Sequence, residues 1–137
     1  MNYTAIAAPM VDEQYNEIAY LLPWCKLRQP EKQGVYELVT FQLKPGGLAI
    51  WGDAFRAAIS AYVNTSYTEL VGVFNTEYGS LNQVHVLWWY ENEDSRAAGR
   101  RLAYEDARVA AAVRESVRFL VSQKNVLLQP TAFSPLK

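Results

Sequence analysis

Cysteine and histidine each occur once in the 137 residues of this chain, as Cys25 and His85. A single cysteine excludes an intramolecular disulfide and is typical of a reducing compartment. One cysteine and one histidine also cannot supply the four ligands of a structural zinc site, so we expect no metal. A chain of this length can build a sufficient hydrophobic core without a disulfide or a metal site, so we expect a domain that is stabilised by packing.

An excess of basic residues is also lacking, since 13 Lys and Arg face 14 Asp and Glu, for a formal net charge of −1. This balance argues against a nucleic-acid partner. No apolar run approaches the roughly 20 residues of a transmembrane segment. The first 25 residues contain no Lys or Arg, whereas transit peptides are Arg-rich and secretory signals begin with basic residues. We therefore expect a soluble, cytoplasmic protein.

Proline, glycine and charge divide the first part of the chain. Residues 1–15 are small, polar and without periodicity, and we expect a flexible N-terminal segment there. Residues 16–34 contain the short β-favouring run EIAYLLPWCKL, which Pro23 stops, and then the linker RQPEKQG. A domain boundary is expected near Gly34.

From Val35 onward the pattern alternates between strands and helices. Residues 35–43 favour a strand that ends at KPGG, and an apolar helical stripe follows at Leu48, Trp51, Phe55, Ile59 and Tyr62. Two strand-like runs, YTELVGVFNTEY and NQVHVLWWYE, are joined by GSL as in a hairpin. Residues 92–106 have helical composition, Asp106 can cap a second helical stretch, and NVLLQP is a last short strand.

This order predicts an α+β, ferredoxin-like βαββαβ fold, with both helical segments on one face of a four-stranded antiparallel sheet. The other sheet face then needs a cover. Val84, Val86, Trp88 and Tyr90 alternate with a second series in the same strand, His85, Leu87 and Trp89. An apolar surface of this kind is not left against water, so a partner is expected to cover it.

Several separate runs together resemble the NipSnap family, in particular its third-homologue branch: VYELVTFQLKPG, a Trp and a Phe on the following helix, LVGVFNTEYGSLNQVHVLWWYE, and LVSQKNVLLQPTAFSPLK. The resemblance implies a parent with two related ferredoxin-like domains, of which residues 35–137 are the second. Residues 16–34 would then be the residual strand and linker of a truncated upstream repeat. It also implies that such domains pair face to face into an α+β barrel. Without the upstream domain, we expect this chain to form a homodimer through the sheet face, or to fold its orphan strand back onto a sheet edge.

The function that the resemblance implies is that of a non-enzymatic interaction protein, linked to vesicular transport and mitochondrial quality control. Protein partners are expected, with no cofactor, no catalytic residues, and a cytosolic location that includes association with mitochondria. The alternative is a small-molecule-binding or oxygenase-like dimeric α+β barrel enzyme, whose candidate pocket residues are His85, Glu37, Trp89, Asn75 and Tyr78.

His85 is open to two interpretations. Its ordinary pKa of about 6.5 suits a general base, and an imidazole also suits haem ligation in a barrel cavity. A strand histidine satisfied by a neighbouring carbonyl or hydroxyl is the favoured interpretation, because no Asp or Glu lies in an orienting position on the same strand. Glu37, on the neighbouring strand, is the candidate partner. Trp88 and Trp89 should point to opposite faces and serve mainly in packing.

Three further sequence patterns suggest a binding function but also have an ordinary structural explanation. KPGG lacks the length and ending of a phosphate-binding loop, so a turn is favoured. Trp24 and Leu27 have the aromatic-x-x-leucine spacing of peptides that add a strand to an autophagy receptor, a spacing that also arises by chance. A solvated helical face is the ordinary explanation for the arginines Arg96, Arg100, Arg101, Arg108, Arg114 and Arg118.

Overall fold

The computed structural model describes residues 3–63 and 67–136. Its sheet consists of β1 (Ile18–Leu21), β2 (Val35–Leu43), β3 (Thr68–Tyr78), β4 (Gln83–Tyr90) and β5 (Leu120–Leu128). Its helices are α1 (Tyr3–Ala7), η1 (Ala8–Met10), α2 (Gly47–Tyr62), α3 (Glu93–Glu105), α4 (Ala107–Ser116) and η2 (Val117–Phe119). The strands lie in the order β1-β3-β4-β2-β5 with antiparallel neighbours.

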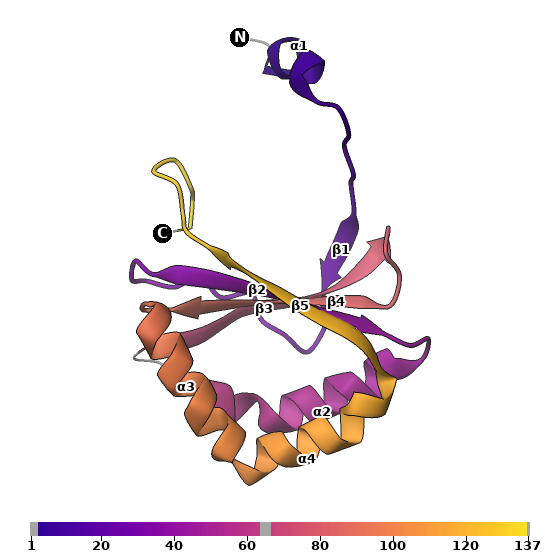
Figure 1. Cartoon of the computed structure of the whole chain (residues 1–137), viewed down its shortest axis with the longest axis vertical. Helices are drawn as coiled ribbons and strands as arrows, with labels where there is room; N and C mark the ends of the chain where they lie inside the picture. Colours follow the sequence, from indigo (N-terminus) through magenta and orange to yellow (C-terminus); the bar gives the residue numbers. More distant parts are fainter. Residues whose placement is uncertain (1–2, 64–66, 137) are drawn as a thin grey trace.

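The predicted ferredoxin-like fold is confirmed, and a fifth strand from residues 16–34 joins the sheet at one edge, which is one of the two expected outcomes for the orphan strand. Helices α2, α3 and α4 cover one face of the sheet, and no helix of the described chain covers the other (Figure 1). The four predicted strands form the centre and one edge of the sheet. The fifth, β1, lies at the opposite edge and pairs with β3, where Tyr20 opposes Asn75.

Local sequence explains where the elements begin and end. Gly46 adopts a left-handed backbone with φ of 80°, which only glycine accepts readily, and so turns β2 into α2. The Asn92 side chain accepts a hydrogen bond from the Ser95 amide at 2.8 Å and caps α3. Asp106 caps α4 as predicted, through the Arg108 amide.

The main core lies between the sheet and the helices. Val39, Val73, Val84, Val86 and Trp88 are each at most 3% exposed. On α2, Trp51 stacks on Phe55 with ring centroids 4.9 Å apart, and Phe55 and Tyr62 both contact the ring of Trp88. The helical stripe predicted from the sequence therefore faces this core.

The residues before Gly34 are partly integrated into the same core. Leu22 and Cys25, just beyond β1, are buried among the core side chains, and the Leu22 amide donates to the Val73 carbonyl at 2.9 Å. Gly34 itself packs so closely that a Cβ there would collide with the Tyr90 carbonyl and the Trp89 indole. The origin of residues 16–34 in an upstream repeat stays a prediction.

The N-terminal segment contains a short helix, where the sequence predicted a flexible end. Helix α1 and η1 have no buried residue, and an extended stretch separates them from β1 (Figure 1). Residues 1–2 of this segment and Lys137 lie outside the described residues.

We predict that the segment after β1 contributes to the stability of the domain. Leu22→Ala should lower the free energy of unfolding by about 2–5 kcal/mol, because a fully buried leucine is truncated. Leu27→Ala is the matched control, since Leu27 is 65% exposed, and it should change stability by no more than about 0.5 kcal/mol. Urea unfolding measures both. Equal effects of the two substitutions would contradict the integration of this segment.

Candidate functional site

Two polar clusters occupy the centre of the sheet, one on each face. Strand alternation separates them, because Glu37 opposes Trp88 on β4 whereas His85 on β4 opposes Thr40 on β2. The Glu37 cluster faces the helices, and the His85 cluster faces the helix-free side of the sheet.

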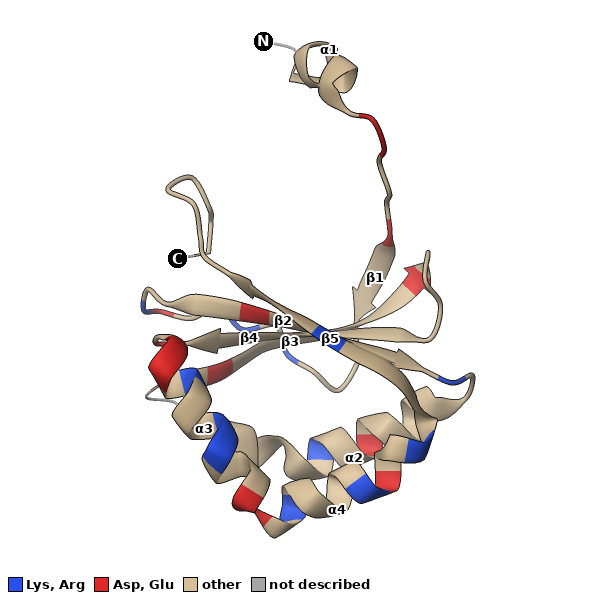
Figure 2. Cartoon of the chain, in the orientation of Figure 1, with Lys and Arg blue, Asp and Glu red and all other residues tan. Residues whose placement is uncertain are grey.

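The carboxylate of Glu37 is 1% exposed and is held from three elements. From α3, Arg96 donates through Nε at 2.9 Å and also through Nη2, and Arg100 donates through Nη2 at 2.7 Å. Asn125 of β5 donates through Nδ2 at 2.6 Å, and the Tyr90 hydroxyl of β4 donates at 3.3 Å. In Figure 2, β2 carries acidic colour and lies above α3, whose ribbon carries basic colour.

Opposing effects set the pKa of Glu37. Burial of the carboxyl disfavours its charged form, but the hydrogen bonds from Arg96 and Asn125 and the charge of Arg100 outweigh burial and lower the pKa to about 2. Burial raises the pKa of Tyr90 to about 12, so its hydroxyl keeps the proton that it donates to Glu37. The cluster is therefore a carboxylate with two guanidinium partners and neutral donors.

The solvated-face explanation is wrong for Arg96 and Arg100, which point toward the sheet. It fits other members of the set better: Arg101 and Arg114 are exposed, and the half-exposed Arg108 pairs with Asp106 at 2.7 Å. The signal that could have revealed the cluster is the position of Glu37 in a strand whose alternate residues, Val39 and Phe41, face the core. A buried carboxylate there requires a cationic partner.

His85 is half-buried among hydroxyl groups on the helix-free face. Its Nδ1 lies 2.9 Å from Thr40 Oγ1, and its Nε2 lies 3.4 Å from Thr76 Oγ1 and 3.9 Å from a Glu17 carboxylate oxygen. Burial lowers the pKa of the imidazole, the charge of Glu17 raises it, and Lys124 lowers it, with a net decrease. The favoured interpretation, a strand histidine satisfied by a neighbouring hydroxyl, agrees with these contacts.

The five candidate pocket residues do not converge on one site. Glu37 lies on the opposite face from His85, so it cannot orient the imidazole. Trp89 is 1% exposed and packs with Tyr36 and Val71 at one end of the helix-free face. Asn75 donates to the Tyr20 hydroxyl at 3.1 Å, and Tyr78 is largely exposed at the end of β3.

The structure places other groups around His85. A depression of about 330 Å³ is lined by atoms of the following residues: Glu17, Leu38, Thr40, Gln83, His85, Lys124, Asn125 and Val126. Of these, Glu17 precedes β1 and Lys124 belongs to the opposite edge strand. Both are far from His85 in the sequence, so their proximity to it could not be predicted from local patterns. Among the described residues, no three His, Cys, Asp or Glu side chains are grouped to hold a metal ion.

Trp24 and Leu27 differ in accessibility. Trp24 packs against Phe55, with ring centroids 6.2 Å apart, and the Arg56 guanidinium lies 5.5 Å from its ring centre. Leu27 is exposed. Use of the two as a strand-adding peptide would require Trp24 to leave Phe55, and this use stays a prediction.

We predict that Glu37 makes the free energy of unfolding depend on pH in the acidic range. The ionised carboxylate stabilises the fold above its ordinary pKa of 4.5, and this contribution is lost as pH falls toward the folded-state pKa of about 2. Glu37→Gln should lower the free energy of unfolding near pH 7 by about 3–5 kcal/mol, because two partly buried guanidinium groups lose their carboxylate partner. The difference from the original chain should shrink below pH 4.5.

Urea unfolding at a series of pH values measures this difference. Glu77→Gln is the matched control, an exposed glutamate in β3, and should change stability by no more than about 0.5 kcal/mol at any pH. A difference for Glu37→Gln that is small near neutral pH, or that stays constant in acid, would contradict the charge cluster.

We predict that His85 titrates below its ordinary pKa of 6.5. Because burial disfavours the imidazolium in the folded chain, the histidine favours folding above pH 6.5, and this contribution declines as pH falls through the folded-state pKa. NMR observes the imidazole without ambiguity, since the chain has one histidine. Glu17→Gln should lower the pKa further, because the carboxylate charge raises it. A measured pKa at or above 6.5 would refute this environment.

Comparison with known proteins places these features in context. The NIPSNAP family profile matches residues 36–135. The human protein NipSnap homolog 3A is 68% identical over 128 residues, which cover 93% of this chain and 52% of that protein. The chain therefore spans about half the length of the curated relatives that it matches.

Solved structures agree on the fold. A NIPSNAP family protein of unknown function from Agrobacterium tumefaciens superposes with a TM-score of 0.69 at 26% identity, over 81% of this chain and 100% of that chain. A putative antibiotic biosynthesis monooxygenase from Nitrosomonas europaea superposes with a TM-score of 0.57 at 11% identity, over 70% of this chain and 97% of that chain. The second likeness shows the fold alone.

Proposed function

The chain belongs to the NIPSNAP family, and from this premise we propose that it is a non-enzymatic interaction protein that presents the surfaces of one α+β domain to protein partners. The roles that the family resemblance implies, in vesicular transport and mitochondrial quality control, are part of this proposal. So is a cytosolic location with association with mitochondria. Within the described residues, no helix has the length and apolar character needed to cross a membrane.

The helix-free sheet face supports this proposal. It carries apolar side chains on neighbouring strands, because Leu38 opposes Val126 and Tyr36 opposes Leu128. Val126 and Leu128 remain 50% and 42% exposed. Soluble domains rarely leave contiguous apolar surface in water, and such patches mark sites of protein interaction.

The edge strand β5 adds to the same surface. It pairs with β2 on one side only, and its other backbone edge is unpaired within the described sheet. An exposed edge strand with apolar side chains readily pairs with or packs against another chain. The C-terminal tail protects only part of the face, where Leu136 packs against the Tyr36 and Trp89 cluster.

We propose that a second copy of this chain covers this face. A twofold dimer would place the same patch of both subunits together and would bury Val126 and Leu128. Pairing of two such sheets would form the α+β barrel that the family resemblance implies. The proposal is specific to the sheet face, because the helices already cover the opposite one.

We predict a homodimer at micromolar concentration, measured by size-exclusion chromatography with light scattering. Leu128→Lys should convert it to a monomer, because a lysine would be buried in the apolar interface. Leu102→Lys is the matched control, since Leu102 is exposed on α3, away from the sheet face. A monomeric original chain, or equal dissociation by both substitutions, would refute the sheet-face dimer.

The alternative function, a ligand-binding or oxygenase-like barrel, has one supporting observation in the polar depression around His85. Haem ligation by His85 would shift and broaden its imidazole NMR signals. Unchanged imidazole signals in the presence of haem favour the interaction protein.

A further inference from the structure

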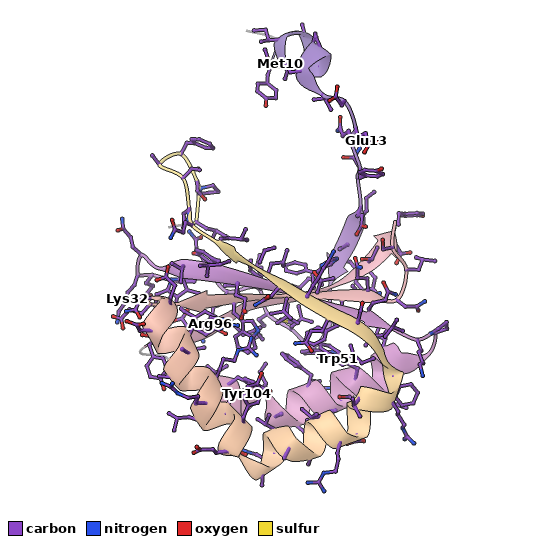
Figure 3. All side chains as sticks on the ribbon, in the orientation of Figure 1. Met10, Glu13, Lys32, Trp51, Arg96 and Tyr104 are labelled. Atoms are coloured by element: carbon purple, nitrogen blue, oxygen red, sulfur yellow. The ribbon has the colours of Figure 1, made fainter. Side chains whose placement is uncertain are left out.

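A cavity lies between the helices and the sheet, on the opposite face from the proposed dimer contact. Its volume is about 150 Å³, and its walls are mainly aromatic and aliphatic: Phe41, Trp51, Phe55, Tyr62, Trp88 and Val117. In Figure 3, Trp51 of α2 and Tyr104 of α3 lie beside the space between the helices and the sheet. None of the candidate pocket residues named from the sequence lines it.

Arg100 supplies the cation of this cavity. Its side chain is 17% exposed, and its guanidinium carbon lies 5.7 Å from the centre of the Tyr62 ring. One Nη donates to Glu37, but Nε is buried and has no acceptor among the described residues. A buried N–H without an acceptor is rare in folded proteins and points to an additional hydrogen-bond partner.

The charge of the cluster leaves room for an anion. Arg96 and Arg100 bring two positive charges to the single carboxylate of Glu37. One positive charge is therefore not balanced within the cluster. A carboxylate that approached Arg100 from the cavity would balance it and accept the free Nε–H in a charge-assisted hydrogen bond.

The size and lining of the cavity indicate which group the carboxylate is attached to. A cavity of about 150 Å³ with an apolar lining holds a molecule the size of benzene. Aromatic walls favour a planar ring, which gains offset or edge-to-face contacts with its neighbours. A long acyl chain would exceed this volume.

We propose that this cavity binds a small aromatic monocarboxylate, with the ring among Trp51, Phe55 and Trp88 and the carboxylate on Arg100. Entry lies beside α4 and η2, where the lining residues Val113 and Val117 are 50% and 54% exposed. A ligand can therefore enter from this side without opening the sheet.

Benzoate tests the proposal, with benzamide as its neutral counterpart of nearly the same shape. Binding to the full chain is followed by NMR chemical shifts and by tryptophan fluorescence, because Trp51 and Trp88 line the cavity. Benzoate should bind at least about tenfold more tightly than benzamide, since only benzoate offers a charged acceptor to Arg100. Equal affinities would overturn the role of Arg100.

A matched pair of substitutions locates the site. Ala112 of α4 lines the cavity, and the adjacent Ala111 is exposed. Ala112→Leu should weaken benzoate binding by about tenfold or more by filling the cavity, and Ala111→Leu should leave it unchanged. Neither alanine belongs to the Glu37 cluster, and a melting temperature within a few degrees of the original verifies folding. Benzoate that does not bind, or that binds equally to both variants, would overturn the proposal.

Discussion

The ion pair between Glu37 and the two arginines of α3 fixes how the helical layer sits on the sheet. A carboxylate that is 1% exposed cannot remain ionised without partners, so α3 must present Arg96 and Arg100 to β2. The Asn125 contact extends this constraint to β5, and Tyr90 extends it to β4. Three strands and a helix are thus held in register by one charge. Apolar packing alone tolerates small shifts, whereas these hydrogen bonds require a defined geometry.

Strand alternation then determines which chemistry is available on each face. One side of β2 and β4 presents Glu37 and Trp88 to the helices, and the other presents Thr40 and His85 to the helix-free side. A single site that used both His85 and Glu37 would require their side chains to pass through the sheet. The charged cluster therefore belongs to the core and its cavity, and the hydroxyl-bound histidine belongs to the surface that a protein partner would cover.

Local patterns predicted most of the fold, and the nonlocal contacts escaped them. The limits of β2 match the predicted residues 35–43, and Trp51 and Phe55 face the core as their helical spacing indicated. Strand β5 begins at Leu120, earlier than the predicted NVLLQP, because its ladder with β2 defines it and most of its side chains are exposed. The partnership of Glu37 with Arg96 and Arg100 depends on the rotation of α3 over the sheet, for which no local pattern exists. An edge position for β1 is one of the two outcomes that the sequence predicts, but no local pattern identifies β3 as its partner.

Strand β5 links the two proposed binding events. Val126 and Leu128 face the helix-free side, and Gln123, which opposes Phe41, lines the cavity on the helix side. A dimer that covered the outer side of β5 would hold the strand against β2, and that position also sets the width of the cavity. If the ligand carboxylate binds more tightly to the dimer than to the monomer, linkage requires that the ligand strengthen dimerisation by the same factor. If its affinity does not depend on the position of β5, the ligand leaves the dimerisation equilibrium unchanged. The sheet edge is therefore the element through which an interaction surface and an internal ligand would act on each other.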